Sequence, residues 1–304
     1  MLLKRILVTG ASGFVGQHLL KFFEDANYEI VSLERRIWHP ASKNVQVIDW
    51  PIGNEIPATL AQQEFHALIH LAWDTASRSA WDTQLEQLRR LNQLCELLPR
   101  VKKVISLGTS EEYGLANGIL DESTRPVLPL SAYGWGKESA RQLLASRAKK
   151  TCTSLIWLRA FTIYGEGQSG NMLIPYALNQ ARKGSTAKFT DGIQERDFIY
   201  VGDVVRAIIY ALNEDLPGNT TLNIGTGIGT QVRNVITAIA THFENNDNFE
   251  IGGLARDPNL PLQQLAQTSL ADKLIGFTAK TSITEGLARI LHPSNNFKIT
   301  KTTD

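Results

Sequence analysis

A glycine-rich turn near the N-terminus constrains the fold more than any other feature of the sequence. Ile6-Leu7-Val8 reads as a short buried strand, and a helix with apolar periodicity is expected from about Gln17 to Asp25. Between them, Gly10 permits a tight turn, Gly13 allows a pyrophosphate to approach the backbone, and Gly16 allows helix and strand to pack closely. The phosphates would then lie at the positive N-terminus of the helix. The segment predicts a dinucleotide-binding strand–turn–helix unit, with a purely structural turn as the alternative.

Strands and helices alternate over the first half of the chain. Further strands are expected at 29–33, 45–49, 67–73, 104–107 and 154–159, with helices at about 80–98 and from Tyr133 onward. This alternation predicts an α/β fold with a doubly wound, parallel Rossmann sheet and a smaller, mostly helical C-terminal substrate-binding region. We expect the dinucleotide-binding domain at 1–165 and 200–227, the substrate-binding region at 166–199 and 228–292, and a flexible tail at 293–304.

The residues that follow the second and third strands bear on the choice of dinucleotide. Glu34 would accept hydrogen bonds from ribose hydroxyls, as in NAD binding, whereas Arg35 and Arg36 would pair with a 2′-phosphate, as in NADP binding. Two adjacent arginines favour NADP, and NAD stays open. Asp49 could accept a hydrogen bond from the adenine amine or simply form a turn before Trp50.

Composition excludes several classes of protein. The net charge of +1 over 304 residues argues against a nucleic-acid-binding surface. No apolar run is long enough to span a membrane, and the first residues read as a strand and not as a signal peptide. The histidines show no metal-ligand spacing, and Cys95 and Cys152 are the only cysteines, so a metal site and a disulfide framework are not expected. A reducing cytoplasm is the expected location.

Tyr133 and Lys137 form a candidate acid/base pair. Their spacing of four places both side chains on one face of a helix, one turn apart. A phenol has a reference pKa of about 10, and a neighbouring ammonium favours its phenolate form. Thr109 leaves the carboxyl end of the fifth strand, where ligands of open α/β sheets bind. Its hydroxyl is therefore expected to share a substrate oxygen with Tyr133.

Six motifs in order carry a resemblance to a known family. They are Thr9-Gly10-x-x-Gly13-x-x-Gly16, His70-Leu71-Ala72, Thr109 four residues before Tyr113-Gly114, Tyr133-x-x-x-Lys137, Arg159–Gly165 and Arg196–Val204. From about residue 4 to 227 the chain resembles the extended short-chain dehydrogenases/reductases of the epimerase/dehydratase group. Within that group it looks most similar to reductases of 4-keto-6-deoxy nucleotide sugars.

The resemblance implies a role for each matching residue. Thr109 would orient the substrate, Tyr133 would be the acid/base, and Lys137 would bind the nicotinamide ribose and lower the pKa of Tyr133. Arg196 would contact the substrate diphosphate, with an ion pair to Asp197 or Asp203 as the structural alternative. The expected cofactor contacts are Gly10, Ser12, Gly13, Phe14, Val15, Gly16, Glu34, Arg35, Arg36, Asp49, Trp50, Leu71, Ala72, Trp73, Tyr133 and Lys137. Further substrate contacts are expected from Ser110, Asn171 and Lys188.

Several reactions remain open within this resemblance. The favoured one is reduction of a nucleoside diphosphate 4-keto-6-deoxyhexose at C4, in which NADPH delivers a hydride and Tyr133 protonates the alkoxide. A 4,6-dehydratase would use Glu111 as the base that removes the C5 proton, and a C4 epimerase needs only Thr109, Tyr133, Lys137 and NAD. A reductase of a non-sugar ketone and a non-catalytic NADP-binding protein are further alternatives. A homodimer through a four-helix bundle, made by the 80–98 helix and the Tyr133 helix, is also implied.

Overall fold

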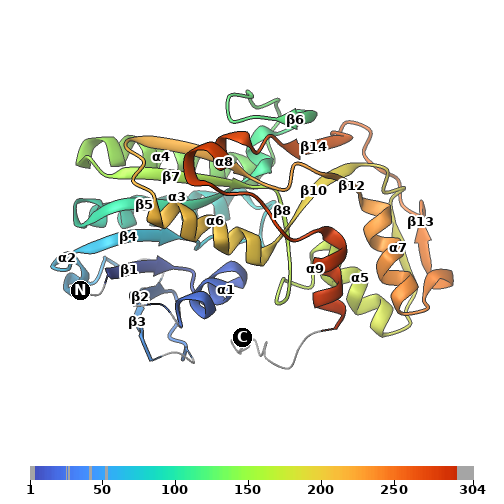
Figure 1. Cartoon of the computed structure of the whole chain (residues 1–304), viewed down its shortest axis with the longest axis horizontal. Coiled ribbons are helices and arrows are strands. Elements are labelled where there is room, and N and C mark those ends of the chain that lie inside the picture. Colours follow the sequence, from blue (N-terminus) through green and yellow to red (C-terminus); the bar gives the residue numbers. More distant parts are fainter. Residues whose placement is uncertain (1–3, 25, 27, 41–42, 52–53, 293–304) are drawn as a thin grey trace.

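The computed structural model describes residues 4–24, 26, 28–40, 43–51 and 54–292. Its centre is a seven-stranded sheet in the order β11-β7-β5-β4-β1-β2-β3 (Figure 1). These strands are β1 (Lys4–Thr9), β2 (Tyr28–Glu34), β3 (Val45–Asp49), β4 (Phe65–His70), β5 (Val101–Thr109), β7 (Ser154–Ala160) and β11 (Asn219–Ile224). Each neighbouring pair in this order is parallel, so all the carboxyl ends share one edge. The predicted doubly wound Rossmann fold is confirmed.

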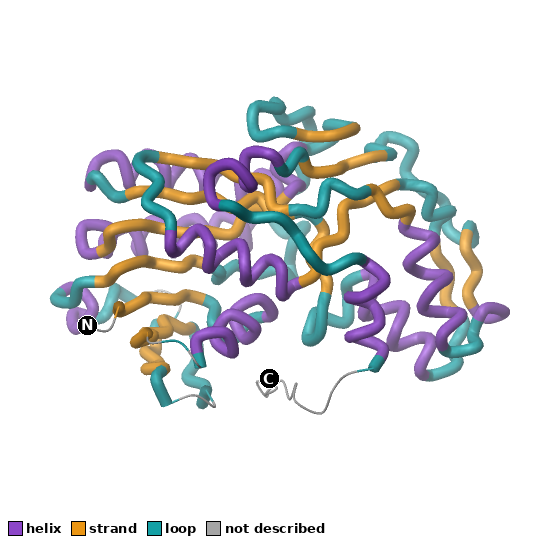
Figure 2. The backbone as a smooth tube through the Cα atoms, in the orientation of Figure 1, coloured by secondary structure: helices purple, strands orange, loops and turns teal. Residues whose placement is uncertain are grey.

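Helices cover both faces of this sheet (Figure 2). The helices α1 (Phe14–Phe23) and α6 (Val201–Asn213) pack together on one face. The pair α3 (Trp81–Leu94) and α4 (Ala132–Thr151) packs on the other. A short α2 (Ala58–Ala61) and a 3-10 helix η1 (Cys95–Arg100) complete that side. Pro99 lies inside η1, after the end of α3.

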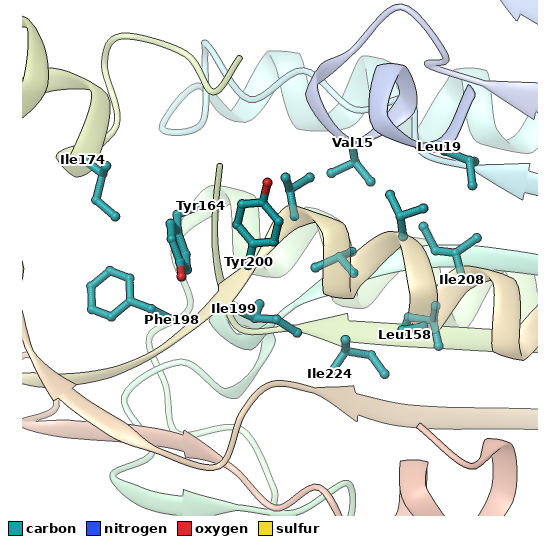
Figure 3. Close-up of a cluster of buried hydrophobic side chains, with 14 of the residues drawn as sticks. Val15, Leu19, Leu158, Tyr164, Ile174, Phe198, Ile199, Tyr200, Ile208 and Ile224 are labelled. Atoms are coloured by element: carbon teal, nitrogen blue, oxygen red, sulfur yellow. The ribbon is translucent and has the colours of Figure 1, made fainter. Parts of the chain in front are cut away.

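Buried side chains of the strands alternate between the two faces. On β1, Ile6 and Val8 belong to the core under α1 and α6, whereas Leu7 belongs to the core under α3 and α4. Figure 3 shows the first core, in which Val15 of α1 and Ile208 of α6 lie close to the central sheet. A strand buried on both faces is typical of a parallel sheet covered by helices. The apolar runs seen in the sequence therefore follow from the architecture.

A second region lies beyond the carboxyl edge of the central sheet (Figure 1). Its main sheet has the order β12-β10-β14-β6, and β8 also pairs with β10. The bounds are β6 (Gly118–Leu120), β8 (Thr162–Tyr164), β10 (Glu195–Tyr200), β12 (Gly229–Gln231) and β14 (Gln263–Ala266), with a separate pair β9 (Ala187–Phe189) and β13 (Phe249–Ile251). The helices are α5 (Leu173–Arg182), α7 (Val232–His242) and α9 (Ile283–Leu291), with the 3-10 helix η3 (Asn246–Asn248). The helix α8 (Ser269–Ile275) returns to pack against β11 and α6, and the 3-10 helix η2 (Ser110–Tyr113) packs against α4.

This second region contains strands that the sequence analysis did not predict. Its strands have three to six residues, and a segment of three residues is too short to show a hydrophobic period. Strand β6 comes from far upstream of its partner β14, so their pairing is not visible in any local pattern. The expected tail at 293–304 lies outside the described residues.

The order of the central strands locates the functional crevice. From β1 the chain adds β2 and β3 on one side, and then β4 and β5 on the other. In such sheets a crevice opens at the carboxyl ends of the strands where the order reverses. Here that point lies between the ends of β1 and β4, at the glycine-rich turn and the residues after His70.

Candidate active site

The glycine-rich turn has the geometry that a diphosphate requires. Gly10 has a φ of +75°, and a Cβ at this position would lie 2.6 Å from the backbone nitrogen of Ala72. Only glycine combines this backbone conformation with such a close approach. Gly13 is the N-cap of α1 and supplies no side-chain acceptor, so the first N–H groups of the helix remain available to an anion. These residues fit the pyrophosphate of a dinucleotide.

Two cavities meet at this turn. A cavity of about 500 Å³ lies toward β2 and β3, and one of about 310 Å³ lies toward β5 and α4. The expected cofactor residues that line the first, here called the adenosine-side cavity, are Gly10, Ser12, Gly13, Glu34, Arg35, Arg36, Trp50, Leu71, Ala72 and Trp73. Asp49 is exposed at the end of β3 and is not among the residues that line it.

Glu34 binds the glycine-rich turn itself. Its Oε1 accepts hydrogen bonds from the backbone nitrogens of Ala11 (2.7 Å) and Ser12 (3.3 Å) and from the Ser32 hydroxyl (2.7 Å). Its Oε2 accepts one from the Ser12 hydroxyl (2.8 Å). The carboxylate is 6% exposed, so these donors compensate for its burial. Glu34 therefore fixes the shape of the turn, and its role as a ribose ligand stays a prediction.

The rim of the adenosine-side cavity is cationic. Arg35 and Arg36 are exposed, and neither forms an ion pair within the part of the chain that the structure describes. Arg90, from α3, lies 4.4 Å over the ring of Trp50 and donates to its carbonyl oxygen. Burial lowers the pKa of Arg90, and the charge of Arg35 lowers it further. The position of Arg90 at this cavity was not predicted from the sequence, because an arginine inside a polar helix is usually a solvated residue.

The second cavity, here called the catalytic cavity, contains the predicted catalytic residues. Thr109, Ser110, Glu111, Tyr133 and Lys137 line it together with Phe14, Val15 and Gly16. Ser131 caps α4, and its hydroxyl accepts from the backbone nitrogen of Gly134. A Cβ at Gly134 would overlap the carbonyl oxygen of Glu111, so the glycine lets α4 press against η2. This contact brings Tyr133 to the same cavity as Thr109.

Lys137 is buried between β5 and two indole rings. Its Nζ donates to the Leu107 carbonyl at 2.8 Å and lies 4.4 Å from the ring centroid of Trp73. Burial lowers the pKa of Lys137 to about 7; Glu112 opposes this change and Arg78 adds to it. Its ammonium and amine forms are therefore both populated near neutral pH.

His70 packs beside the glycine-rich turn. Its Nδ1 lies 2.7 Å from the Thr9 hydroxyl, and its ring is buried at the end of β4. Burial, assisted by the charge of Lys137, lowers the pKa of His70 to about 3. The imidazole is neutral at physiological pH and packs beside the turn.

Tyr133 is buried in the catalytic cavity. Burial raises the pKa of Tyr133 well above its ordinary value. The cation that opposes the rise is Arg78, whose guanidinium carbon lies 4.2 Å over the phenol ring, and not Lys137 as the resemblance implied. Glu111 and Glu112 raise the pKa of Tyr133 further. The phenol is therefore protonated at neutral pH.

Glu111 is engaged through both carboxylate oxygens. Its Oε1 forms an ion pair with Arg78, and its Oε2 accepts from the Ser131 hydroxyl at 2.8 Å. Arg78 also contacts the sulfur of Met172, 3.9 Å away on the far wall of the cavity. Sequence reasoning missed Arg78, since it lies in the loop after β4, where no motif or periodicity marks it.

The predicted substrate contacts other than Ser110 are not among the residues that line the two cavities. Arg196, on β10, donates to the carbonyl oxygens of Glu195 and Pro261 and has no acidic partner in the described chain. The alternative ion pairs are absent there, because Asp197 binds backbone N–H groups of 226, 227 and 266, and Asp203 pairs with Arg206. Lys188 is exposed and pairs with Glu250, and Asn171 is exposed before α5. Their substrate roles stay predictions.

Residues 4–292, apart from the gaps given above, contain neither a metal-binding cluster nor a membrane-spanning helix. No cluster of histidine, cysteine or acidic side chains there could bind a metal ion. No helix there is long and apolar enough to cross a bilayer.

Comparison with known proteins identifies the family. The model of the NAD dependent epimerase/dehydratase family matches residues 6–225, and the chain belongs to that family. It is 27% identical to the CDP-abequose synthase of Salmonella muenchen, over 95% of this chain and 97% of that protein. It is 25% identical to the dTDP-6-deoxy-L-talose 4-dehydrogenase (NAD(P)(+)) of Kitasatospora kifunensis, over 94% of each chain.

A solved structure agrees with this membership. The UDP-glucuronic acid 4-epimerase from Bacillus cereus, in complex with UDP-glucuronic acid and NAD, superimposes with a TM-score of 0.84 at 27% identity. The match covers 94% of this chain and 98% of that one. The protein is thus a nucleotide-sugar-modifying enzyme of the NAD-dependent epimerase/dehydratase family.

Proposed function

We propose that the protein reduces a nucleoside diphosphate 4-keto-6-deoxyhexose at C4. The observation that carries this choice within the family is the state of Glu111, whose two oxygens are already bound by Arg78 and Ser131. A dehydratase needs a free carboxylate to remove the C5 proton, whereas a C4 reductase needs none. The relative from Kitasatospora kifunensis, named as a 4-dehydrogenase of a 6-deoxy sugar, supports redox chemistry at this carbon.

The residues of the catalytic cavity account for such a reaction. The nicotinamide supplies the hydride when it is bound. Thr109 can donate its hydroxyl hydrogen to the C4 oxygen, because that hydroxyl is otherwise only an acceptor from the backbone nitrogen of Glu111 at 3.3 Å. The protonated Tyr133 phenol then transfers its proton to the same oxygen as negative charge develops there. Lys137, one turn along α4, provides a positive charge on this side of the cavity.

We also propose NADPH as the preferred reductant. Arg35 and Arg36 offer two exposed guanidinium groups at the rim of the adenosine-side cavity. Glu34, which would favour ribose hydroxyls, is occupied by the turn. A 2′-phosphate satisfies the arginines better than a hydroxyl does, because charge-assisted hydrogen bonds are the stronger kind. Arg196, with no acidic partner in the described residues, is proposed to contact the diphosphate of the sugar nucleotide.

The first experiment is an absorbance assay at 340 nm. The purified enzyme is mixed with NADPH or NADH and with 4-keto-6-deoxy derivatives of GDP-, CDP-, dTDP- and UDP-sugars. We expect NADPH oxidation with at least one 4-keto sugar and an alcohol at C4 in the product. Turnover of an ordinary NDP-hexose without added reductant would instead identify a 4,6-dehydratase or a C4 epimerase.

The variant Glu111→Gln separates reduction from dehydration. For the reductase we expect kcat to change by less than about tenfold, since the residue would act only through its contacts with Arg78 and Ser131. For a dehydratase the same change removes the base and lowers kcat by about 10²- to 10⁴-fold. Ser131→Ala, which frees one carboxylate oxygen without removing the charge, is the matched control.

A homodimer is proposed through the outer face of α3 and α4. Trp81 and Leu85 on α3 are 52% and 53% exposed, and Trp81 lies 5.4 Å from the ring of Trp135 on α4. Apolar side chains this exposed on a helix that packs beside α4 are typical of an interface. Light scattering should give twice the chain mass for the wild type and the monomer mass for Leu85→Glu. A monomeric wild type would contradict the proposal.

A further inference from the structure

Glu112 is a buried carboxylate directly behind the catalytic cavity. Its side chain is 0% exposed, and its Oε1 accepts a hydrogen bond from the backbone nitrogen of Thr109 at 2.8 Å. The Thr109 hydroxyl in turn caps the start of η2, so the two residues form a reciprocal capping box. The spacing of a threonine and a glutamate three residues later is the sequence signal of such a box. Glu112 thereby fixes the backbone that presents the Thr109 hydroxyl.

The carboxylate is anchored from the neighbouring strand β7. Arg159 donates its Nε to Oε2 of Glu112 at 2.8 Å, and the Trp157 indole N–H lies 3.1 Å from both oxygens. A Cβ at Gly108 would collide with the Trp157 ring, so the end of β5 is shaped around this contact. All the donors that reach the carboxylate come from rigid strands or from the turn that it caps. Its position is therefore determined by the fold.

Lys137 binds the same backbone segment as Glu112. Its Nζ donates to the carbonyl of Leu107, whereas Glu112 accepts from the nitrogen of Thr109, two residues along β5. The Trp157 ring connects them, since Lys137 Nζ is 5.9 Å from its centroid and Glu112 binds its N–H. Lys137 has no direct carboxylate contact in the described chain, so Glu112 is the buried negative charge that faces it.

We propose that Glu112 is a positioning residue for the reaction: it orients Thr109 through the backbone and supplies the negative charge opposite the Lys137 ammonium. The inference rests on the roles proposed above for Thr109 and Lys137. Nothing in the family motifs identified from the sequence assigned a role to this position.

Several other charged groups surround Lys137 and Glu112. Burial and Arg78 oppose the charge of Lys137 while Glu112 favours it, and Lys137 in turn lowers the pKa of His70. Glu112 itself faces Arg159 on β7 and Glu138 on α4, and burial raises the pKa of Glu112 while Arg159 opposes this. Around Arg159 are also Tyr113, 4.3 Å from its guanidinium carbon, and Arg141, which pairs with Glu138.

The test measures the titration of Lys137 directly. Lysine labelled with ¹³C at Cε gives a resonance for each side chain, and the Lys137 signal is identified by its absence in Lys137→Met. In Glu112→Gln the shape is kept and the charge is lost, so we expect the midpoint to move down by about one pH unit. At pH 7 the charged fraction, and with it kcat, should fall by about fivefold while KM for the sugar stays unchanged.

Two further variants test the effect of Glu112 on Lys137 if Glu112→Gln folds poorly. Glu112→Leu combined with Arg159→Met removes both buried charges at similar volume, a replacement that proteins often tolerate. We expect it to show the same downward shift in the Lys137 midpoint. Glu112→Asp keeps the charge but not the reach, so the midpoint should stay near that of the wild type while kcat falls.

Glu138→Gln is the matched control. Glu138 lies next to Lys137 on α4, and its carboxylate is 3.6 Å from Arg159, but it makes no contact with Thr109. We expect the titration of Lys137 to be unchanged in this variant. A shift as large as that of Glu112→Gln, or no shift in any folded Glu112 variant, would overturn the proposal. The titration needs no sugar, so a failure to find a substrate would count against the proposed function alone.

Discussion

The two cavities that meet at Gly10 and Gly13 place their charges in opposite surroundings. At the adenosine-side cavity, Arg35 and Arg36 are exposed and form no ion pair in the described chain. Behind and within the catalytic cavity, Glu111 pairs with Arg78, and Glu112 pairs with Arg159 at less than 10% exposure on either side. The arginines of the adenosine-side cavity are therefore available to a ligand, whereas the carboxylates at the catalytic cavity are already paired within the protein.

This difference predicts different responses to mutation. An exposed cation contributes a modest, salt-dependent amount to binding, since water and counterions screen it. A buried charge contributes strongly, because removing its partner leaves it without compensation in a medium of low polarity. Substitutions of the buried Glu112–Arg159 pair and of the buried Tyr133 should therefore have large effects on stability or rate, and substitutions at the adenosine rim should shift affinity by graded amounts.

The largest effect is expected for Tyr133→Phe. The change removes the proton donor from a site where burial has kept the phenol protonated. We expect kcat to fall by about 10²- to 10⁴-fold, while the dissociation constant for NADPH changes little. Steady-state kinetics and a fluorescence titration of NADPH measure the two quantities. Full turnover in this variant would contradict the assignment of the acid/base.

The next effect concerns stability and falls on Arg159→Met. Burial acts to lower the pKa of Arg159, and the adjacent Glu112 carboxylate more than offsets this, so the pKa is raised. Without the arginine, Glu112 would be a buried charge lacking its main partner, and we expect the free energy of unfolding to fall by about 3–5 kcal/mol. Urea denaturation measures it.

A surface pair provides the comparison for that loss. Arg100 and Glu64 form an ion pair at 2.9 Å with side chains 48% and 71% exposed. For Arg100→Met we expect a loss of less than about 1 kcal/mol. Equal losses in the two variants would remove the distinction between buried and exposed pairs in this protein.

A smaller effect is expected at the adenosine rim. Replacing both Arg35 and Arg36 with alanine should weaken NADPH binding by about tenfold and NADH binding much less, because only NADPH carries the 2′-phosphate. The loss should shrink as salt is added. Calorimetric titration with both dinucleotides measures it. Arg89, 78% exposed on α3 and outside both cavities, provides the control variant Arg89→Ala.

The smallest effect expected is the pH dependence conferred by Lys137. Its pKa is lowered to about 7, so the ammonium is present below this pH and is lost as the pH rises through it. If the ammonium contributes to cofactor binding, the affinity for NADPH should fall by about fivefold between pH 7 and pH 8. The contribution of Lys137 to stability has the opposite sign: the unfolded chain is more protonated between pH 7 and the ordinary lysine pKa, so stability rises over that window. Lys137→Arg should show neither trend.

Much of the fold and part of the site could be predicted from the sequence. The parallel sheet was predictable because strands and helices alternate along the first half of the chain and each glycine of the turn has a separate steric reason. The roles of Thr109, Tyr133 and Lys137 follow from the resemblance, and the structure brings all three to one cavity. The strands of the second region were not predicted, because pairs such as β6 with β14 join short segments far apart in the chain.

What the sequence by itself determined is local: strand, turn and helix types, and the chemical groups that follow each strand. Only the tertiary structure decided which residues are buried and which partners adjacent residues have. Glu111 and Glu112 are neighbours in the chain, yet one lines the catalytic cavity beside Arg78 and the other is buried against Arg159. Glu34 likewise reads as a ribose ligand but binds the glycine-rich turn. The physical reason is that the charge state and the partners of a carboxylate depend on burial and on donors from distant strands, which no local pattern encodes.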